Sequence, residues 1–63
     1  MKSKPMHHYA FSVLGWLNEQ TVMASSEEEA VQKAASMAAG EDNIVAFRKV
    51  SPFEAKQIIR SWG

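Results

Sequence analysis

The sequence predicts a single α+β domain with the element order β-β-α-β-α. Three observations predict it. Apolar and polar residues alternate near the N-terminus, and two later stretches carry apolar residues at helical spacing. Each of these two stretches begins after a serine that has a glutamate three residues later. A chain of 63 residues is long enough for one domain and too short for two. We expect residues 1–7 to form a flexible basic tail and residues 8–63 to form the domain.

The first two strands are predicted as a hairpin. From His8 the side chains alternate between two faces, Tyr9, Phe11 and Val13 on one and Ala10, Ser12 and Leu14 on the other. Gly15 marks a bend or a bulge, and Asn18 with Glu19 is the best turn candidate. The second strand is expected at residues 20–24.

The first helix has clear start and stop signals. Ser26 and Glu29 have the spacing of a capping box, in which the serine hydroxyl accepts from a free amide and the carboxylate reaches back to the cap. Gly40 is expected to end the helix in the position after its C-cap. The apolar stripe consists of Ala30, Val31, Ala34, Ala35, Met37 and Ala38.

Residues 44–50 are predicted as the third strand, with Val45 and Phe47 on one face and Ile44, Ala46 and Arg48 on the other. A second helix follows, because Ser51 is a cap residue, Pro52 suits the first helical position and Glu54 suits the first turn. The apolar stripe of this helix is Ala55, Ile58, Ile59 and Trp62.

A right-handed crossover through the first helix makes the third strand parallel to the second. If the third strand lies beside the first, every pairing is antiparallel and the strand order is 2-1-3. We therefore expect a three-stranded antiparallel sheet packed by helices. Tyr9, Phe11, Phe47 and Trp62 are expected to fill the core beneath the helices. The terminal helix has two possible places. It covers the second sheet face and completes three layers, or it leaves that face as an apolar patch of Leu14, Trp16, Met23, Ile44 and Ala46.

Composition narrows the function classes. The absence of cysteine excludes disulfides and thiolate metal sites and is typical of a cytoplasmic protein. No apolar run approaches the roughly 18 residues of a membrane-spanning helix. His7 and His8 are adjacent in a predicted strand and point to opposite faces, so we expect no metal site. We likewise expect no cofactor, no catalytic residue and no enzymatic activity.

Three surfaces are candidates for partner binding. The first is apolar and contains Trp16 and Met23. The second is basic and consists of Lys2, Lys4, Arg48, Lys49, Lys56 and Arg60, if the tail and the last helix lie near the third strand. The third is acidic and joins Glu27, Glu28 and Glu29 to Glu41 and Asp42, although charges at a helix start are more often a solvated first turn.

Residues 9–50 resemble the ββαβ plan of small bacteriophage host-takeover proteins, namely the phage inhibitors of bacterial RNA polymerase of the T7 type and the anti-CRISPR proteins. The resemblance rests on an aromatic first strand, the junction Ala24, Ser26, Glu28, Glu29 and Ala30, and a third strand with Arg48 and Lys49. The helix from Pro52 departs from the polymerase-inhibitor plan. The resemblance implies a non-enzymatic phage protein that occupies a surface of a host machine, with Arg48 and Lys49 as contacts.

The first functional hypothesis is therefore a protein-binding module, specifically a phage-encoded inhibitor of a host or defence complex in the bacterial cytoplasm. The net charge of zero disfavours nucleic acid as the partner. A nucleic-acid-binding module that uses the six basic residues is the second hypothesis. A homodimer formed through the apolar sheet face is the third.

Overall fold

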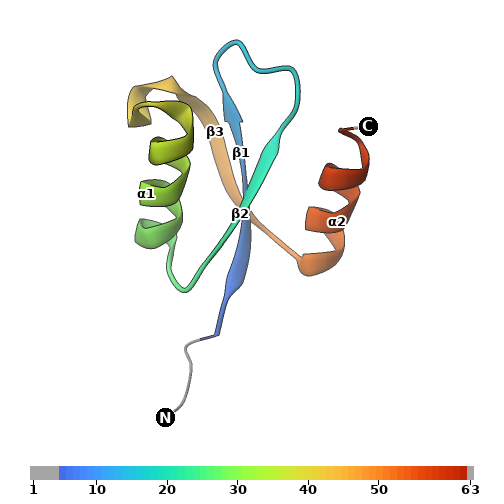
Figure 1. The fold of residues 1–63 in the computed structure, drawn as a ribbon. Coiled ribbons are helices and arrows are strands. Elements are labelled where there is room, and N and C mark those ends of the chain that lie inside the picture. The colour runs from blue at the N-terminus through green and yellow to red at the C-terminus, as the bar shows by residue number, and fades with distance from the viewer. Residues whose placement is uncertain (1–4, 63) are drawn as a thin grey trace.

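The computed structural model describes residues 5–62, and Figure 1 shows their arrangement. The elements are β1 (His7–Val13), β2 (Gln20–Ala24), α1 (Glu27–Ala38), a short 3-10 helix η1 (Glu41–Asn43), β3 (Ile44–Val50) and α2 (Pro52–Arg60). The three strands form one antiparallel sheet in the order β2-β1-β3. The predicted fold class, element order and strand order are thus confirmed. β1 begins at His7, and residues 1–4 of the expected flexible tail lie outside the described residues.

The two helices lie on opposite faces of the sheet, so the domain has three layers (Figure 1). This settles the position of the terminal helix, for which the sequence allowed two answers. The expected apolar patch on the second sheet face does not form as a continuous surface. Part of that face is covered by α2, where Ala55 packs against Ala10 and Val50.

The larger core lies between α1 and the sheet. Phe11 and Val13 pack there against Ala34 and Ala38, and Tyr9 packs against Ala24 and Ala30. Phe47 closes this layer from β3, and its ring stacks on that of Tyr9 with the centroids 5.6 Å apart. Since alanines occupy the buried stripe of α1, the helix backbone can approach the sheet closely.

The smaller core lies between α2 and the sheet, where Ala10, Val50 and Ala55 are buried and Ile58 packs against them. Trp62 was expected to share one core beneath the helices with Tyr9, Phe11 and Phe47, and this is wrong. Its side chain belongs to the α2 layer and is 39% exposed, and its indole N–H donates to the carbonyl oxygen of Glu19.

A β-bulge changes the faces at the start of β3. Ser12 pairs with Ala46, but the next residue, Val13, pairs with Ile44, which leaves Val45 as an extra residue. Ile44 and Phe47 therefore both pack against the α1 core, and Val45 is 61% exposed. We predicted that Val45 and Phe47 share one face of the sheet and that Ile44 and Ala46 share the other. This is wrong, because strict alternation ends at a bulge.

The N-terminus of α1 differs in one detail from the predicted capping box. The Ser26 hydroxyl accepts from the Glu29 N–H at 3.2 Å, as expected. The Glu29 carboxylate accepts instead from the Ser25 hydroxyl at 2.9 Å and pairs with Lys33 at 3.4 Å. The hydrogen bond from Ser25, and with a smaller effect the hydrogen bond and charge of Lys33, hold the pKa of the Glu29 carboxyl below its ordinary value of 4.5.

The C-terminus of α1 contains a strained residue. Ala39 adopts the left-handed conformation with φ of 60°, and Gly40 follows with φ of 139° and donates its N–H to the carbonyl of Ala35. Gly40 does follow the helix, as predicted, but the left-handed residue is the alanine before it. An L-residue pays roughly 1–2 kcal/mol for this conformation, and glycine does not.

We predict that Ala39→Gly stabilises the domain by about 0.5–1 kcal/mol, because relief of the left-handed strain exceeds the added chain entropy of glycine in the unfolded state. Urea denaturation measures the free energy of unfolding. The control Ser36→Gly places glycine at an exposed position inside the same helix, and we expect it to lower stability. Equal effects of the two substitutions would contradict this account.

We predict that Glu29→Gln lowers stability at neutral pH and that the deficit shrinks in acid. Because the pKa of Glu29 is lower in the folded protein than in the unfolded chain, its contribution is full above about pH 4.5 and is lost as the pH falls through the folded-state pKa. Thermal melting of both proteins between pH 7 and pH 2 tests this. Glu28→Gln removes a charge from the same turn but keeps the Ser25 and Lys33 contacts, so its deficit should be smaller.

Candidate protein-binding surface

The loop between β1 and β2 exposes three large apolar side chains within four residues. Leu14 is 70% exposed, Trp16 44% and Leu17 fully exposed. We refer to Leu14, Trp16 and Leu17 as the loop patch. Leu14 and Trp16 were expected on a sheet face, which is wrong, because β1 ends at Val13 and Gly15 then turns the chain with φ of 87°.

Backbone hydrogen bonds fix the start of this loop. The N–H of Leu14 donates to the carbonyl of Asn43 at 2.8 Å, and the N–H of Trp16 donates to the carbonyl of Val13 at 3.0 Å. The first bond ties the loop to η1 and the second closes a tight turn. The loop patch is therefore carried by a backbone that is held where it leaves the sheet.

The end of the loop is fastened to β3 and α2. Arg48 forms ion pairs with Glu19 at 3.3 Å and with Glu54 in the first turn of α2. We refer to Arg48, Glu19 and Glu54 as the Arg48 clamp. The hydrogen bond to Glu54, and with a smaller effect the hydrogen bond to Glu19, raise the pKa of the Arg48 guanidinium above its ordinary value. Trp62 adds a hydrogen bond of 2.6 Å to the carbonyl of Glu19.

The structure separates the two residues of the predicted apolar surface. Trp16 lies in the loop, whereas Met23 lies near the other end of β2, opposite His8 on β1. Met23 is 47% exposed on the sheet face that α2 partly covers. The two side chains are exposed as expected, but they do not form one patch.

The described basic residues do not all lie on one side of the sheet. Arg48 pairs with Ala10 and shares the α2 face, and Lys49 pairs with Tyr9 and shares the α1 face. Lys56 and Arg60 lie on the exposed side of α2, and Lys2 and Lys4 lie outside the described residues. Since Lys49 lies on the opposite face from Arg48, and Arg48 is held by two carboxylates, the described cations do not form the single basic face that was expected.

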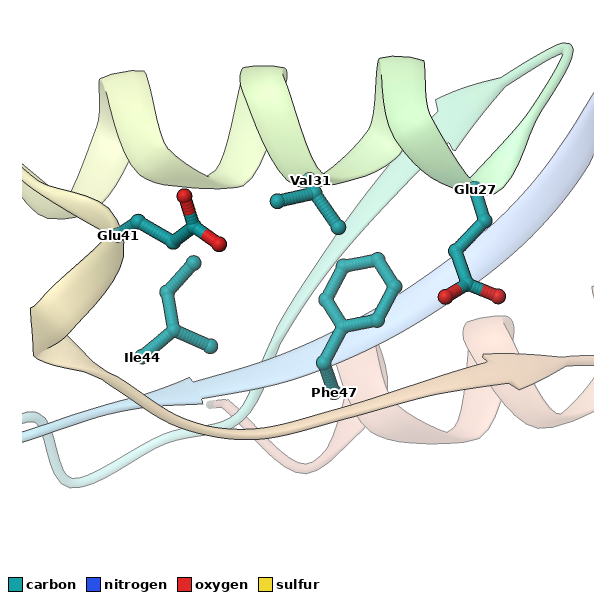
Figure 2. A pocket seen from close by; sticks show the side chains of 5 residues that line it. All are labelled: Glu27, Val31, Glu41, Ile44 and Phe47. Carbon is teal, nitrogen blue, oxygen red and sulfur yellow. The ribbon is translucent and has the colours of Figure 1, made fainter.

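A feature that the sequence did not indicate is a cavity of about 330 Å³ between α1 and β3. Its lining residues are Glu27, Val31, Glu41, Ile44 and Phe47 (Figure 2). Two members of the predicted acidic surface, Glu27 and Glu41, thus flank one apolar opening. The i,i+4 spacing of Glu27 and Val31, which places both on one side of α1, was the available signal.

Within residues 5–62 no group of three or more histidine, aspartate or glutamate side chains is placed to hold a metal ion. No helix in this part of the chain has the length and apolarity needed to cross a membrane. Comparison with known proteins gives no match to a family model, to a curated protein or to a solved structure. The resemblance to phage host-takeover proteins therefore stays a prediction.

We predict that Arg48→Gln lowers the thermal midpoint at low ionic strength and that the loss becomes smaller in 1 M salt, because exposed ion pairs are screened. Calorimetry at both salt concentrations measures it. The control is Lys56→Gln, because Lys56 is an exposed cation of α2 and forms no ion pair within residues 5–62. Identical midpoints for the two variants would show that the Arg48 clamp does not hold the loop and α2.

Proposed function

We propose that this chain is a protein-binding module and not an enzyme, with the loop patch as its principal contact surface. The observation that carries the proposal is the exposure of Leu14, Trp16 and Leu17 on one short loop. Large apolar and aromatic side chains left in water at one place are typical of the centre of a protein interface. In a 63-residue chain they would otherwise be expected to enlarge the small core.

The anchoring of the loop supports the same function. Both ends of the loop are tied to other elements. The bond from Leu14 to Asn43 ties its start to η1, and the Arg48 clamp ties its end to β3 and α2, with a further bond from Trp62. A loop that is already held in place loses less conformational entropy on binding, which improves affinity for a given contact area.

The loop patch alone is too small for tight binding. Complete burial of three large apolar side chains contributes about 5–9 kcal/mol, which is comparable to the cost of association. Further contacts are therefore required. Met23, Lys49, Lys56 and Arg60, which the sequence indicated, are exposed and remain candidates, whereas Arg48 is engaged in its clamp.

The finer proposal is that the partner is a bacterial host or defence complex in the cytoplasm and that the module is a phage-encoded inhibitor. Two features support it: the resemblance of residues 9–50 to phage host-takeover proteins, which includes the junction at residues 24–30, and the small ββαβ layout of the same residues. Nucleic acid is the second candidate, but its support is weaker because the described cations do not form a single basic face. A homodimer is the third candidate. The sequence placed its contact on the apolar sheet face, and because that face does not form a continuous surface, the loop patch is the contact proposed here.

We predict that Trp16→Ala combined with Leu17→Ser weakens partner binding at least 30-fold, since truncation of a central interface residue costs about 2 kcal/mol or more. The measurement is affinity purification from a nuclease-treated bacterial lysate with quantitative mass spectrometry. The control Phe53→Ala removes an aromatic side chain that is 73% exposed in the first turn of α2. Thermal melting verifies that both variants are folded.

Proteins that are retained by wild type and Phe53→Ala, but not by the loop variant, support the proposal. Equal retention by all three would exclude the loop patch as the contact surface. Loss of all retained material on nuclease treatment would favour nucleic acid. Sedimentation at two concentrations detects the homodimer, which the loop variant should abolish.

A further inference from the structure

We propose that the cavity between α1 and β3 is a second binding site, independent of the loop patch, for an extended basic peptide segment of a partner protein. The segment places an apolar side chain on Val31, Ile44 and Phe47 and directs lysine or arginine side chains toward Glu27 and Glu41. We refer to this cavity and the outer edge of β3 as the β3 groove.

The side chains of the β3 groove converge from two layers. Figure 2 shows Val31 pointing from α1 toward the sheet and Phe47 pointing from β3 toward the helix. Glu27 at the start of α1 and Glu41 in η1 stand on either side of this apolar centre. A volume of about 330 Å³ lies at the lower limit for small-molecule pockets and is sufficient for a large side chain.

The opening follows from how α1 is packed. The buried stripe of α1 is made of Ala30, Ala34 and Ala38, which contact the side chains of β1 and β2. Val31 lies beside this stripe and is only half-buried, as are Ile44 and Phe47 opposite it. The edge of the core thus leaves apolar surface in contact with water, and an inserted apolar side chain would cover it.

The position of β3 favours a peptide over a small molecule. Among the described strands β3 pairs with β1 alone, so its outer edge presents unpaired backbone N–H and C=O groups. An extended peptide that pairs with this edge directs every second side chain toward α1, and hence into the cavity. The bulge at Val45 interrupts the edge near η1, but the pairing of residues 46–50 with β1 is regular.

The charges favour a basic segment. Neither Glu27 nor Glu41 takes part in an ion pair within residues 5–62, whereas Glu19, Glu29 and Glu54 all do. Lys49, two residues after Phe47 on the same face, is the nearby cation toward the end of β3. Glu41 lies at the opposite end of the strand, beside Ile44. The peptide cation next to Glu41 therefore faces the less compensated charge and contributes more to binding.

A designed peptide of alternating residues, Thr-Lys-Thr-Phe-Thr-Lys-Thr, tests this site, because a strand places Lys, Phe and Lys on one face. The glutamate peptide Thr-Glu-Thr-Phe-Thr-Glu-Thr and n-butylamine serve as probes of charge and of peptide character. NMR titration of the isotopically labelled full chain reports both the location and the affinity. We expect shift changes confined to β3, η1 and the adjoining side of α1, and binding of the lysine peptide only.

Two charge reversals form a matched pair. Glu41→Lys should weaken binding of the lysine peptide about fivefold or more, because an attraction is replaced by a repulsion. Asp42→Lys changes the net charge equally at a neighbour that does not line the cavity, and should weaken binding less than twofold. The loop variant, Trp16→Ala combined with Leu17→Ser, should bind the peptide as wild type does, which separates this site from the loop patch.

Three results would overturn the proposal: equal weakening by both reversals, equal binding of the lysine and glutamate peptides, or no shift changes at millimolar peptide. Comparable saturation of the cavity by n-butylamine would make it a small-amine site and would also overturn the peptide assignment. Concentration-dependent shifts of the free protein at β3 would instead identify a second copy of this chain as the occupant.

Discussion

Burial of β1 on both faces is the constraint on which the other elements depend. As the central strand, β1 supplies Tyr9, Phe11 and Val13 to one layer and Ala10 to the other. Phe11 is the largest side chain that is fully buried in the described chain. Large residues toward α1 are matched by alanines on that helix, and the small Ala10 is matched by Ala55 on α2. Each helix can therefore lie near the sheet. The apolar core between each helix and the sheet stays small.

The sequence predicted those features that depend on neighbouring residues. Both helix starts follow from a serine whose hydroxyl accepts the N–H three positions later, at Ser26 and at Ser51. The strand order follows from the direction of the strands: β3 runs parallel to β2, so every pairing is antiparallel only when β1 lies between them. The side of the sheet on which α2 packs could not be predicted, because its stripe of Ala55, Ile58, Ile59 and Trp62 suits either face equally. The bulge at Val45 could not be predicted either, since it arises from the pairing of two distant strands.

The candidate sites were predicted less completely, for the same reason. The exposure of Trp16 was expected, but its position in a loop follows from the turn at Gly15. The partners of Arg48 were not indicated, because Glu19 is distant in sequence and reaches it only when the hairpin and β3 are assembled. The β3 groove was missed because it depends on how far α1 extends across the sheet. Only its two glutamates were singled out, and without the apolar centre between them.

The unequal size of the two cores has a consequence for local opening of the native state. Detachment of α2 breaks the small cluster around Ala10, Val50 and Ala55, together with the solvent-exposed Arg48 clamp, while the Phe11 layer is left intact. The free energy needed to detach α2 is consequently smaller than the free energy of global unfolding. Amide hydrogens of α2 then exchange with solvent through a partial opening, and those of β1 exchange only when the whole domain unfolds. We therefore expect the C-terminal helix to open separately from the ββαβ unit.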